Sequence, residues 1–206
     1  MTIILIIITA VVSITAFEKS GIMGKYQLNA YQVVHRKQWY RLFTHAFLHA
    51  NWTHLIVNML VLYFFGSAIE EYFRLQFGAF FIIHYLILYI GAIAVSSLYS
   101  LVRHKDNYYY NAVGASGATS AVLFAFILFN PLGKIYLYFA IPIPGVIFGI
   151  LYLIYSQYMS KRNVDNIGHD AHFWGGVFGF FYPVLINSDL IIRFGRQITS
   201  WFEQVF

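Results

Sequence analysis

Ser116 is the residue of this sequence whose surroundings best suit nucleophilic chemistry. It stands in Gly114-Ala115-Ser116-Gly117 and opens the apolar segment 118–129. This segment ends at Asn130-Pro131, so the predicted helix has about 15 residues and a length of roughly 22 Å, whereas a bilayer core is about 30 Å thick. A hydroxyl at its first turn would therefore lie below the membrane surface, at the positively polarised end of the helix. Irregular backbone at that depth requires a cavity lined by water or protein.

These four residues are also typical of an ordinary helix start, because serine is a common N-cap. Gly114 and Gly117 permit a tight entry turn and the close approach of another backbone. The functional interpretation of Ser116 therefore depends on residues elsewhere in the chain.

His172 is the ionisable side chain best placed to meet Ser116. Gly175 and Gly179 are four residues apart, a spacing that lets two membrane helices approach closely, and His172 lies three residues before Gly175 on the same stripe. A helix that packs on these glycines would also meet His172. Serine becomes a nucleophile when a base within hydrogen-bond reach takes its proton, and imidazole is the usual base. Ser116 and His172 are therefore a candidate catalytic dyad.

A third member of such a site is usually an acid that orients the imidazole. Asp170 is two residues from His172, so on a continuous helix it would point roughly 200° away. Asp165, in the preceding loop, stays an alternative. The sequence favours a site of two residues.

His54 and Asn58 are candidate donors to the oxyanion of acyl transfer. They stand four residues apart and share one face of the apolar stretch 54–69. Polar side chains inside a membrane span are costly and usually face the protein interior. A donor aimed at the oxyanion supplies roughly 3 kcal/mol of transition-state stabilisation. The Ser116 N–H and these two side chains would form the oxyanion hole, whereas His84, alone in the next span, is expected to make a structural hydrogen bond.

The composition indicates a polytopic membrane protein of one domain. Of the 206 residues, 60% are hydrophobic, 20% are aromatic and only 10% are charged, which does not fit a soluble protein. The net charge of +5 suits anionic lipid headgroups, since no basic cluster is large enough for nucleic acid. Cysteine is absent, which excludes disulfides and thiolate metal sites. We expect no cofactor and no metal.

The hydropathy pattern predicts six membrane helices, a structured first loop and an amphipathic tail. Residues 18–51 are a long mixed connection that is expected to be structured. The tail has apolar residues at helical spacing with two arginines between them, which is typical of an interfacial helix. We expect a membrane domain over 1–187 and a tail over 188–206. The predicted spans are 2–17, 54–69 ending at Glu70-Glu71, 78–102, 116–130, one starting at Pro142-Ile143-Pro144 and reaching 159, and one containing 171–179, with an interfacial aromatic stretch at 136–141.

The motifs resemble those of the rhomboid family of intramembrane serine proteases. The resemblance is carried by His54-x-x-x-Asn58, Gly114-x-Ser116-Gly117 and Ala171-His172-x-x-Gly175-x-x-x-Gly179 in that order, and by the first loop with Trp39, Arg41 and Phe43-Thr44-His45-x-Phe47-x-His49. It covers roughly residues 35–185.

The resemblance implies a six-helix bundle around a hydrated cavity that cleaves transmembrane segments of membrane proteins. In that scheme Ser116 is the nucleophile, His172 is the general base, and His54 and Asn58 are the oxyanion donors. Gly114, Gly117, Gly175, Gly179 and Arg41 would have structural roles. The implied partners are transmembrane protein substrates and the lipid bilayer, without nucleic acid, and the oligomeric state is not readable.

One position departs from the family pattern. Four residues after the nucleophile the family often has an aromatic that stacks on the catalytic histidine, whereas this chain has Ser120. A tyrosine from 108–110 or Trp174 would be a substitute.

Three other functions compete with the protease. A metalloprotease would need a His-Glu-x-x-His pair, which is absent, although His45, His49 and His54 are a conceivable metal-binding set. A small transporter would leave the Ser/His/Asn spacing unexplained. A catalytically inactive rhomboid-like protein that binds membrane clients would be expected to lack Ser116 or His172, and both are present.

The sequence gives conflicting signals on membrane orientation. The connections on the active-site side hold 9 Lys and Arg residues and the other side holds 4, so the positive-inside rule favours a cytoplasmic active-site mouth. The resemblance implies a cytoplasmic N-terminus and an outward-facing mouth. We follow the resemblance and expect a multi-pass protein of a bacterial inner membrane.

Overall fold

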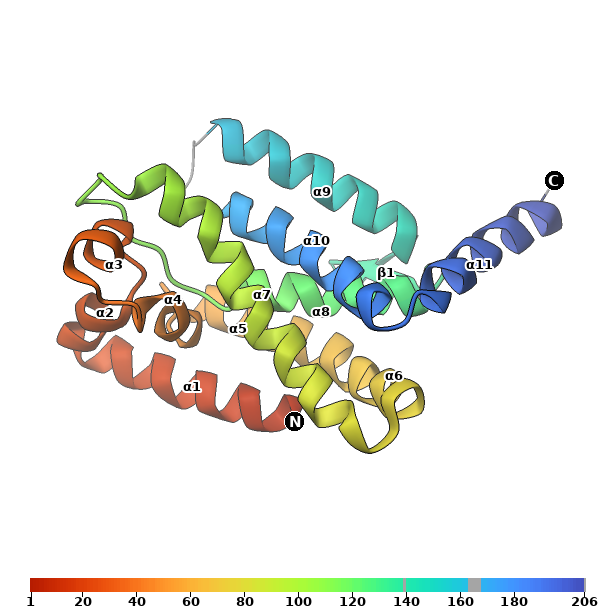
Figure 1. Cartoon of the computed structure of the whole chain (residues 1–206), viewed down its shortest axis with the longest axis horizontal. Coiled ribbons are helices and arrows are strands. Elements are labelled where there is room, and N and C mark those ends of the chain that lie inside the picture. The colour runs from red at the N-terminus through yellow and green to blue at the C-terminus, as the bar shows by residue number, and fades with distance from the viewer. Residues whose placement is uncertain (139, 163–167, 206) are drawn as a thin grey trace.

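The helix that begins at Ser116 lies in the middle of the structure. The computed structural model describes residues 1–138, 140–162 and 168–205. Helix α8 (Ser116–Phe129) is buried on almost every face, because its first half consists of small residues and its second half is apolar. It contacts the helices α5, α6, α7, α9, α10 and α11. The site at its first turn is therefore positioned by most of the fold (Figure 1).

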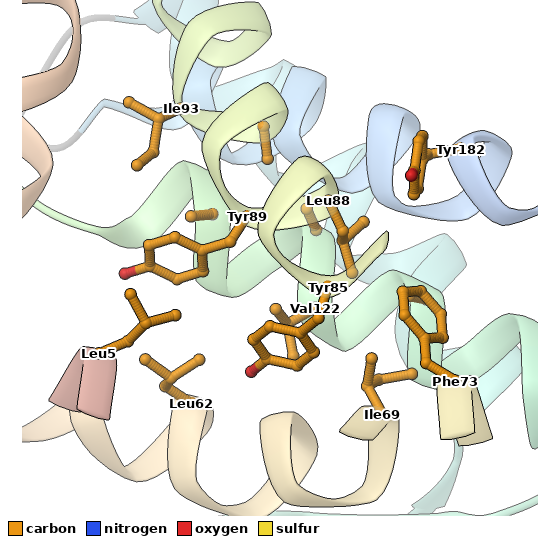
Figure 2. Packing of buried hydrophobic residues seen from close by; sticks show 14 of the residues in the cluster. Leu5, Leu62, Ile69, Phe73, Tyr85, Leu88, Tyr89, Ile93, Val122 and Tyr182 are labelled. Atoms are coloured by element: carbon orange, nitrogen blue, oxygen red, sulfur yellow. The ribbon is translucent and has the colours of Figure 1, made fainter. Parts of the chain in front are cut away.

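Two long helices pack against α8 and form the central part of the bundle. They are α7 (Phe81–His104) and α10 (His169–Ile186), and α9 (Gly145–Arg162) lies alongside α10 at the edge of the bundle (Figure 1). The hydrophobic core forms where α7, α8 and the helices of residues 52–77 meet. Its large buried side chains include Phe73, Tyr85, Leu88 and Tyr89, which are labelled in Figure 2.

The first helix, α1 (Thr2–Glu18), buries polar side chains and exposes apolar ones, the reverse of a helix on the surface of a soluble protein. Its buried residues include Thr2, Thr9 and Ser13, whereas Ile4, Ile7 and other large aliphatic side chains are exposed. Two of these hydroxyls bind other elements: that of Thr2 is 2.8 Å from the hydroxyl of Tyr85, and that of Ser13 donates to the carbonyl of Phe47 at 2.9 Å. Small polar residues facing inward and apolar residues facing outward are the arrangement expected of a helix surrounded by lipid.

The second helix is longer than its sequence predicts. The helix runs through α5 (Trp52–Val61), a π-helical turn η2 (Leu62–Gly66) and α6 (Ser67–Phe77). It does not end at Glu70-Glu71, because both carboxylates find cationic partners within the fold. Glu70 binds the N-terminal ammonium group of Met1, and Glu71 lies 3.3 Å from Arg74.

The connection between α1 and α5 is structured, as expected. It contains the short helices α2 (Ser20–Tyr26), α3 (Ala30–Arg36), α4 (Arg41–Thr44) and η1 (His45–Phe47). Buried Arg41 holds this segment together, because its guanidinium donates to the carbonyls of Gly24 and Gln27 at 3.0 and 2.8 Å.

The segment after α8 is a hairpin, which corrects the prediction. Strand β1 (Lys134–Leu137) pairs antiparallel with β2 (Ile141–Pro144), so the two prolines lie in a strand and do not start a helix. A short 3-10 turn, η3 (Gly78–Phe80), precedes α7. The tail forms α11 (Asp189–Val205), strongly amphipathic, which bends by 114° from α10 and projects from the bundle (Figure 1).

The continuous helical stretch Trp52–His104 is long and apolar enough to cross a membrane. Among the described residues it is the one such stretch, or one of two if the bent pair α10 and α11 is counted as a span. Helices α1 and α8 are apolar but shorter. The structure is therefore mostly helical, whereas the expected set of six spans goes beyond what helix length and composition establish.

Candidate active site

Ser116 is held at the start of α8 by a loop that the first connection fixes in place. The N–H of Gly114 donates to the carbonyl of His45 at 3.0 Å, and Leu28 and Ala112 exchange two backbone hydrogen bonds of 2.9 Å. Gly114 has a φ of +124°, a conformation that side-chain-bearing residues rarely adopt. Position 114 thus requires glycine for its backbone conformation. Backbone hydrogen bonds join the loop before Ser116 to the connection between α1 and α5.

His49 joins this loop to the first helix. Its Nε2 accepts the N–H of Ala115 at 3.4 Å, and its Nδ1 lies 2.9 Å from the hydroxyl of Ser13, which donates to the carbonyl of Phe47. Burial lowers the pKa of His49 to about 3, and the nearby His54 lowers it further as the smaller cause. The imidazole is therefore neutral at pH 7, with its proton on Nδ1 and a free lone pair for Ala115.

The ring of His54 lies directly against Gly114. A Cβ placed on Gly114 would be 2.6 Å from Cε1 and 2.8 Å from Nε2 of His54. The ring also meets His49 edge to face, with 4.9 Å between the ring centroids. His54, on α5, thus packs against the loop at Gly114, which is two residues before Ser116.

Asn58 reaches α8 one turn below Ser116. Its Oδ1 accepts the hydroxyl of Thr119 at 3.0 Å, and its Nδ2 donates to the carbonyl of His54 at 2.9 Å. The Thr119 hydroxyl is also 3.2 Å from the carbonyl of Ser116. These bonds fix which way the amide of Asn58 points and leave its second N–H as a potential donor.

Helices α8 and α10 touch backbone to backbone at the glycines. A Cβ on Gly175 would lie 2.1 Å from the carbonyl oxygen of Gly117, and a Cβ on Gly179 would lie 2.1 Å from that of Ala121. At the same end, a Cβ on Gly117 would be 3.5 Å from the carbonyl oxygen of Ala171. The chain next to His172 therefore lies beside the chain next to Ser116.

The aromatic partner of His172 comes from α9. The rings of Tyr152 and His172 are stacked with centroids 6.0 Å apart and 28° between their planes. The Tyr152 hydroxyl lies 2.6 Å from that of Ser120, one turn after Ser116. The substitutes expected from the sequence, a tyrosine from 108–110 or Trp174, are wrong. Tyr110 stacks on His104, Tyr108 meets Tyr31 and Tyr109 edge to face, and Trp174 meets Phe173 edge to face.

The carboxylate nearest to His172 in sequence has a different partner. Asp170 accepts the hydroxyl of Ser100 at 2.6 Å, and Ser100 in turn accepts that of Tyr110 at 3.1 Å. Asp165, the alternative, lies outside the described residues.

Two of the three histidines of the metal alternative have separate hydrogen-bonding partners. His45 Nε2 lies 2.9 Å from the Ser97 hydroxyl, whereas His49 binds Ser13 and Ala115. Within residues 1–138, 140–162 and 168–205, no three His, Cys, Asp or Glu side chains gather as metal ligands would. His84 makes the structural hydrogen bond expected of it, with Nδ1 at 2.9 Å from the hydroxyl of Tyr182.

Three residues that support the serine loop and the dyad were not predicted in these roles: His49, Thr119 and Tyr152. The four-residue spacing of His45 and His49 was a signal for the first of them, although it does not reveal Ser13 as the partner. Thr119 follows Ser116 by three residues, a spacing at which helix neighbours meet. Tyr152 gives no signal, because one tyrosine among many on α9 is not distinguished by sequence.

The fold and this region define a class of protein: a helical membrane bundle with a serine at the first turn of a short buried helix and a histidine on the helix packed against it. The chain belongs to the rhomboid family. The family's sequence profile, described as "Rhomboid domain", matches residues 36–189. It is thus an integral membrane protein of a family that includes intramembrane proteases.

Three relatives support this assignment. RHOMBOID-like protein 12, mitochondrial, of Arabidopsis thaliana is 31% identical over 65% of this chain and 42% of its own length. Rhomboid-like protein 11, chloroplastic, of the same plant is 42% identical over 39% of this chain and 25% of its own length. The rhomboid protease GluP of Bacillus subtilis (strain 168) is 27% identical over 79% of this chain and 29% of its own length.

The chain thus aligns with less than half the length of each of these relatives. Two of the three carry organellar names, so the comparisons do not support the bacterial inner membrane that was expected from the sequence.

Proposed function

We propose that this chain is an intramembrane serine endopeptidase that cleaves transmembrane segments of other membrane proteins. The observation that carries the proposal is the backbone contact of α8 with α10, in which a Cβ on Gly175 would overlap the carbonyl of Gly117. This contact brings the first turn of α8 beside the turn that carries His172. Family membership and the similarity to a rhomboid protease support the same reaction.

In the proposed reaction, the Ser116 hydroxyl attacks the carbonyl carbon of a peptide bond while His172 takes its proton. The N–H of Ser116 and the side chains of His54 and Asn58 donate to the oxyanion. When the tetrahedral intermediate collapses, His172 gives the proton to the leaving amine, and the acyl group stays on Ser116. Water, deprotonated by His172, then releases the acyl group and restores the serine.

The hydrogen bonds around the site support these roles. His49 fixes Ala115, so that the Ser116 N–H has a defined direction, and Thr119 fixes the amide of Asn58. An oxyanion donor is most effective when its direction is set before the reaction starts. We propose no cofactor and no metal for this chemistry.

The membrane arrangement that fits this reaction has six spans. They would be α1, the stretch α5 to α6, α7, α8, α9 and α10, around a hydrated cavity at the start of α8, with α11 lying in the interface. Residues 1–187 would form the membrane domain and residues 188–206 the tail. The partners would be transmembrane substrates and the lipid bilayer, and nucleic acid would not bind.

The test is cleavage of a reporter membrane protein co-reconstituted with this chain in liposomes. Wild type should release a fragment, whereas Ser116→Ala and His172→Ala should not, although both should elute as folded protein. Ser200→Ala, an exposed serine of α11, is the matched control and should cleave like wild type. Cleavage by Ser116→Ala at the wild-type rate would refute the proposal. Stable reporter binding without cleavage by wild type would favour the inactive client-binding protein.

A further inference from the structure

The aromatic ring stacked on His172 comes from a helix other than α8. Ser120 is buried and lies one turn after Ser116, but its side chain ends at a hydroxyl. The phenol of Tyr152 reaches in from α9, with its ring stacked on His172 and its hydroxyl 2.6 Å from that of Ser120. One side chain thus contacts both the helix of the nucleophile and the proposed base.

An imidazole on a helix can rotate about two side-chain torsions, so a general base needs a neighbour that limits its orientation. In many serine hydrolases a carboxylate does this. Here the nearby Asp170 is hydrogen-bonded to Ser100 of α7. The ring of Tyr152, lying 28° from parallel to that of His172, limits rotation of the imidazole by contact with its face.

We propose that Tyr152 and Ser120 together are the positioning residues for His172. The Tyr152 ring holds the imidazole plane, and Ser120 holds the Tyr152 ring. This inference rests on the proposed function, because it concerns the base of the same reaction.

The position of Tyr152 is itself fixed by its neighbours. The ring of Phe148, one turn earlier on α9, stacks on Tyr152 at 5.9 Å, and Phe124 of α8 packs on it at 5.7 Å. Gly149 allows this approach, because a Cβ there would lie 3.1 Å from Ile127 and 3.4 Å from Phe124. Since the ring comes from α9, the base is oriented only while α9 is packed on α8. The site is therefore built from three helices rather than two.

The test is the steady-state cleavage of a reporter by variants at these two positions. Tyr152→Leu removes the ring, and a misplacement of about 1 Å at a catalytic group costs roughly 10²-fold in rate. We expect kcat to fall by about 10- to 100-fold with KM within about twofold of wild type. Tyr152→Phe keeps the ring and should restore kcat to within about 5-fold, the loss expected for one hydrogen bond.

Ser120→Ala should lower kcat as little as Tyr152→Phe does. The kcat of the double variant Ser120→Ala/Tyr152→Phe should be no lower than that of either single variant. This non-additivity is the result expected if Ser120 acts through Tyr152. A full additional loss in the double variant would overturn the role of Ser120. Tyr158→Leu, the same substitution at an exposed tyrosine of α9, is the control and should leave kcat unchanged.

The melting temperature separates positioning from folding. If Tyr152→Leu does not fold, Tyr152→Met, which refills the space with a flexible side chain, takes its place. A folded Leu or Met variant with wild-type kcat overturns the inference while Ser116-dependent cleavage remains. A loss of kcat that follows the loss of folded protein also overturns it. Cleavage by wild type that does not depend on Ser116 refutes the proposed function, and the role of Tyr152 with it.

Discussion

A single methyl group at Gly175 should force α8 and α10 apart. The Cβ of an alanine there would lie 2.1 Å from the carbonyl oxygen, 2.8 Å from the carbonyl carbon and 2.9 Å from the Cα of Gly117. All three are backbone atoms of a buried helix, so no side chain can rotate out of the way. Ordinary contacts of a Cβ begin near 3.4 Å, so the two backbones must separate by about 1 Å.

The expected cost of Gly175→Ala is larger than its gain in helix propensity. Overpacking of a tight contact typically costs about 1–3 kcal/mol, whereas alanine is favoured over glycine in a helix by about 1 kcal/mol. The melting temperature should fall by roughly 2–10 °C. The rate of cleavage should fall by roughly 10²-fold, because the same displacement of about 1 Å separates Ser116 from the turn that carries His172.

The assay pairs thermal unfolding in detergent with reporter cleavage measured well below the melting temperature. Gly195→Ala is the matched control, since a Cβ at this helical position meets nothing within 4 Å. It should be neutral or slightly stabilising. If Gly175→Ala behaves like Gly195→Ala in both measurements, α8 and α10 do not touch at Gly175, and this contact does not bring Ser116 beside His172.

Three further outcomes are expected. Asn58→Ala should lower kcat by about 10²–10³ with little change in KM, and melting should change by only a few degrees because Thr119 keeps its bond to the Ser116 carbonyl; unchanged kcat with a collapsed melting temperature would make Asn58 structural. Gly114→Ala should reduce cleavage by roughly 10²-fold, because a Cβ there meets the His54 ring and the φ of +124° is strained; wild-type activity would contradict this. The pKa of His49 is about 3 in the folded protein and 6.5 in the unfolded chain, so the stability that neutral His49 contributes above pH 6.5 is lost as the pH falls toward 3, by up to about 1.4 kcal/mol per pH unit. The melting temperature of His49→Gln in detergent should therefore depend less steeply on pH in this range than that of wild type. Identical pH profiles would refute this.

The sequence predicts the helices well where their physical cause is local. The apolar run after Ser116 and the stop at Asn130-Pro131 locate α8 to within one residue, and the glycines of α10 predict a close helix contact, which α8 makes. The predicted end of the second helix, at Glu70-Glu71, was wrong, and the reason is a contact with a part of the chain that is distant in sequence. Glu70 lies inside the helix and accepts the backbone N–H of Thr2 at 3.1 Å, a contact between residues 68 positions apart in sequence.

The hairpin and the partner of His172 illustrate the same limit. Pro142 and Pro144 fit an edge strand as well as they fit the start of a helix. Which of the two forms depends on whether this segment pairs with residues 134–137. Tyr152 meets His172 only because Gly149 lets α9 approach α8. The pairing of His49 with Ser13 likewise depends on α1 packing against the first connection. Motif spacing reports which residues can do chemistry, whereas these contacts are set by how the helices pack.

The central claim is that His172 activates the hydroxyl of Ser116. The most direct test is to treat the detergent-solubilised protein with a serine-directed isocoumarin and to locate the adduct by peptide mass spectrometry. We expect one adduct, on the peptide that contains Ser116, absent from Ser116→Ala and formed at least about 10²-fold more slowly in His172→Ala. An adduct on another serine, or labelling of Ser116 at the same rate without His172, would contradict the account.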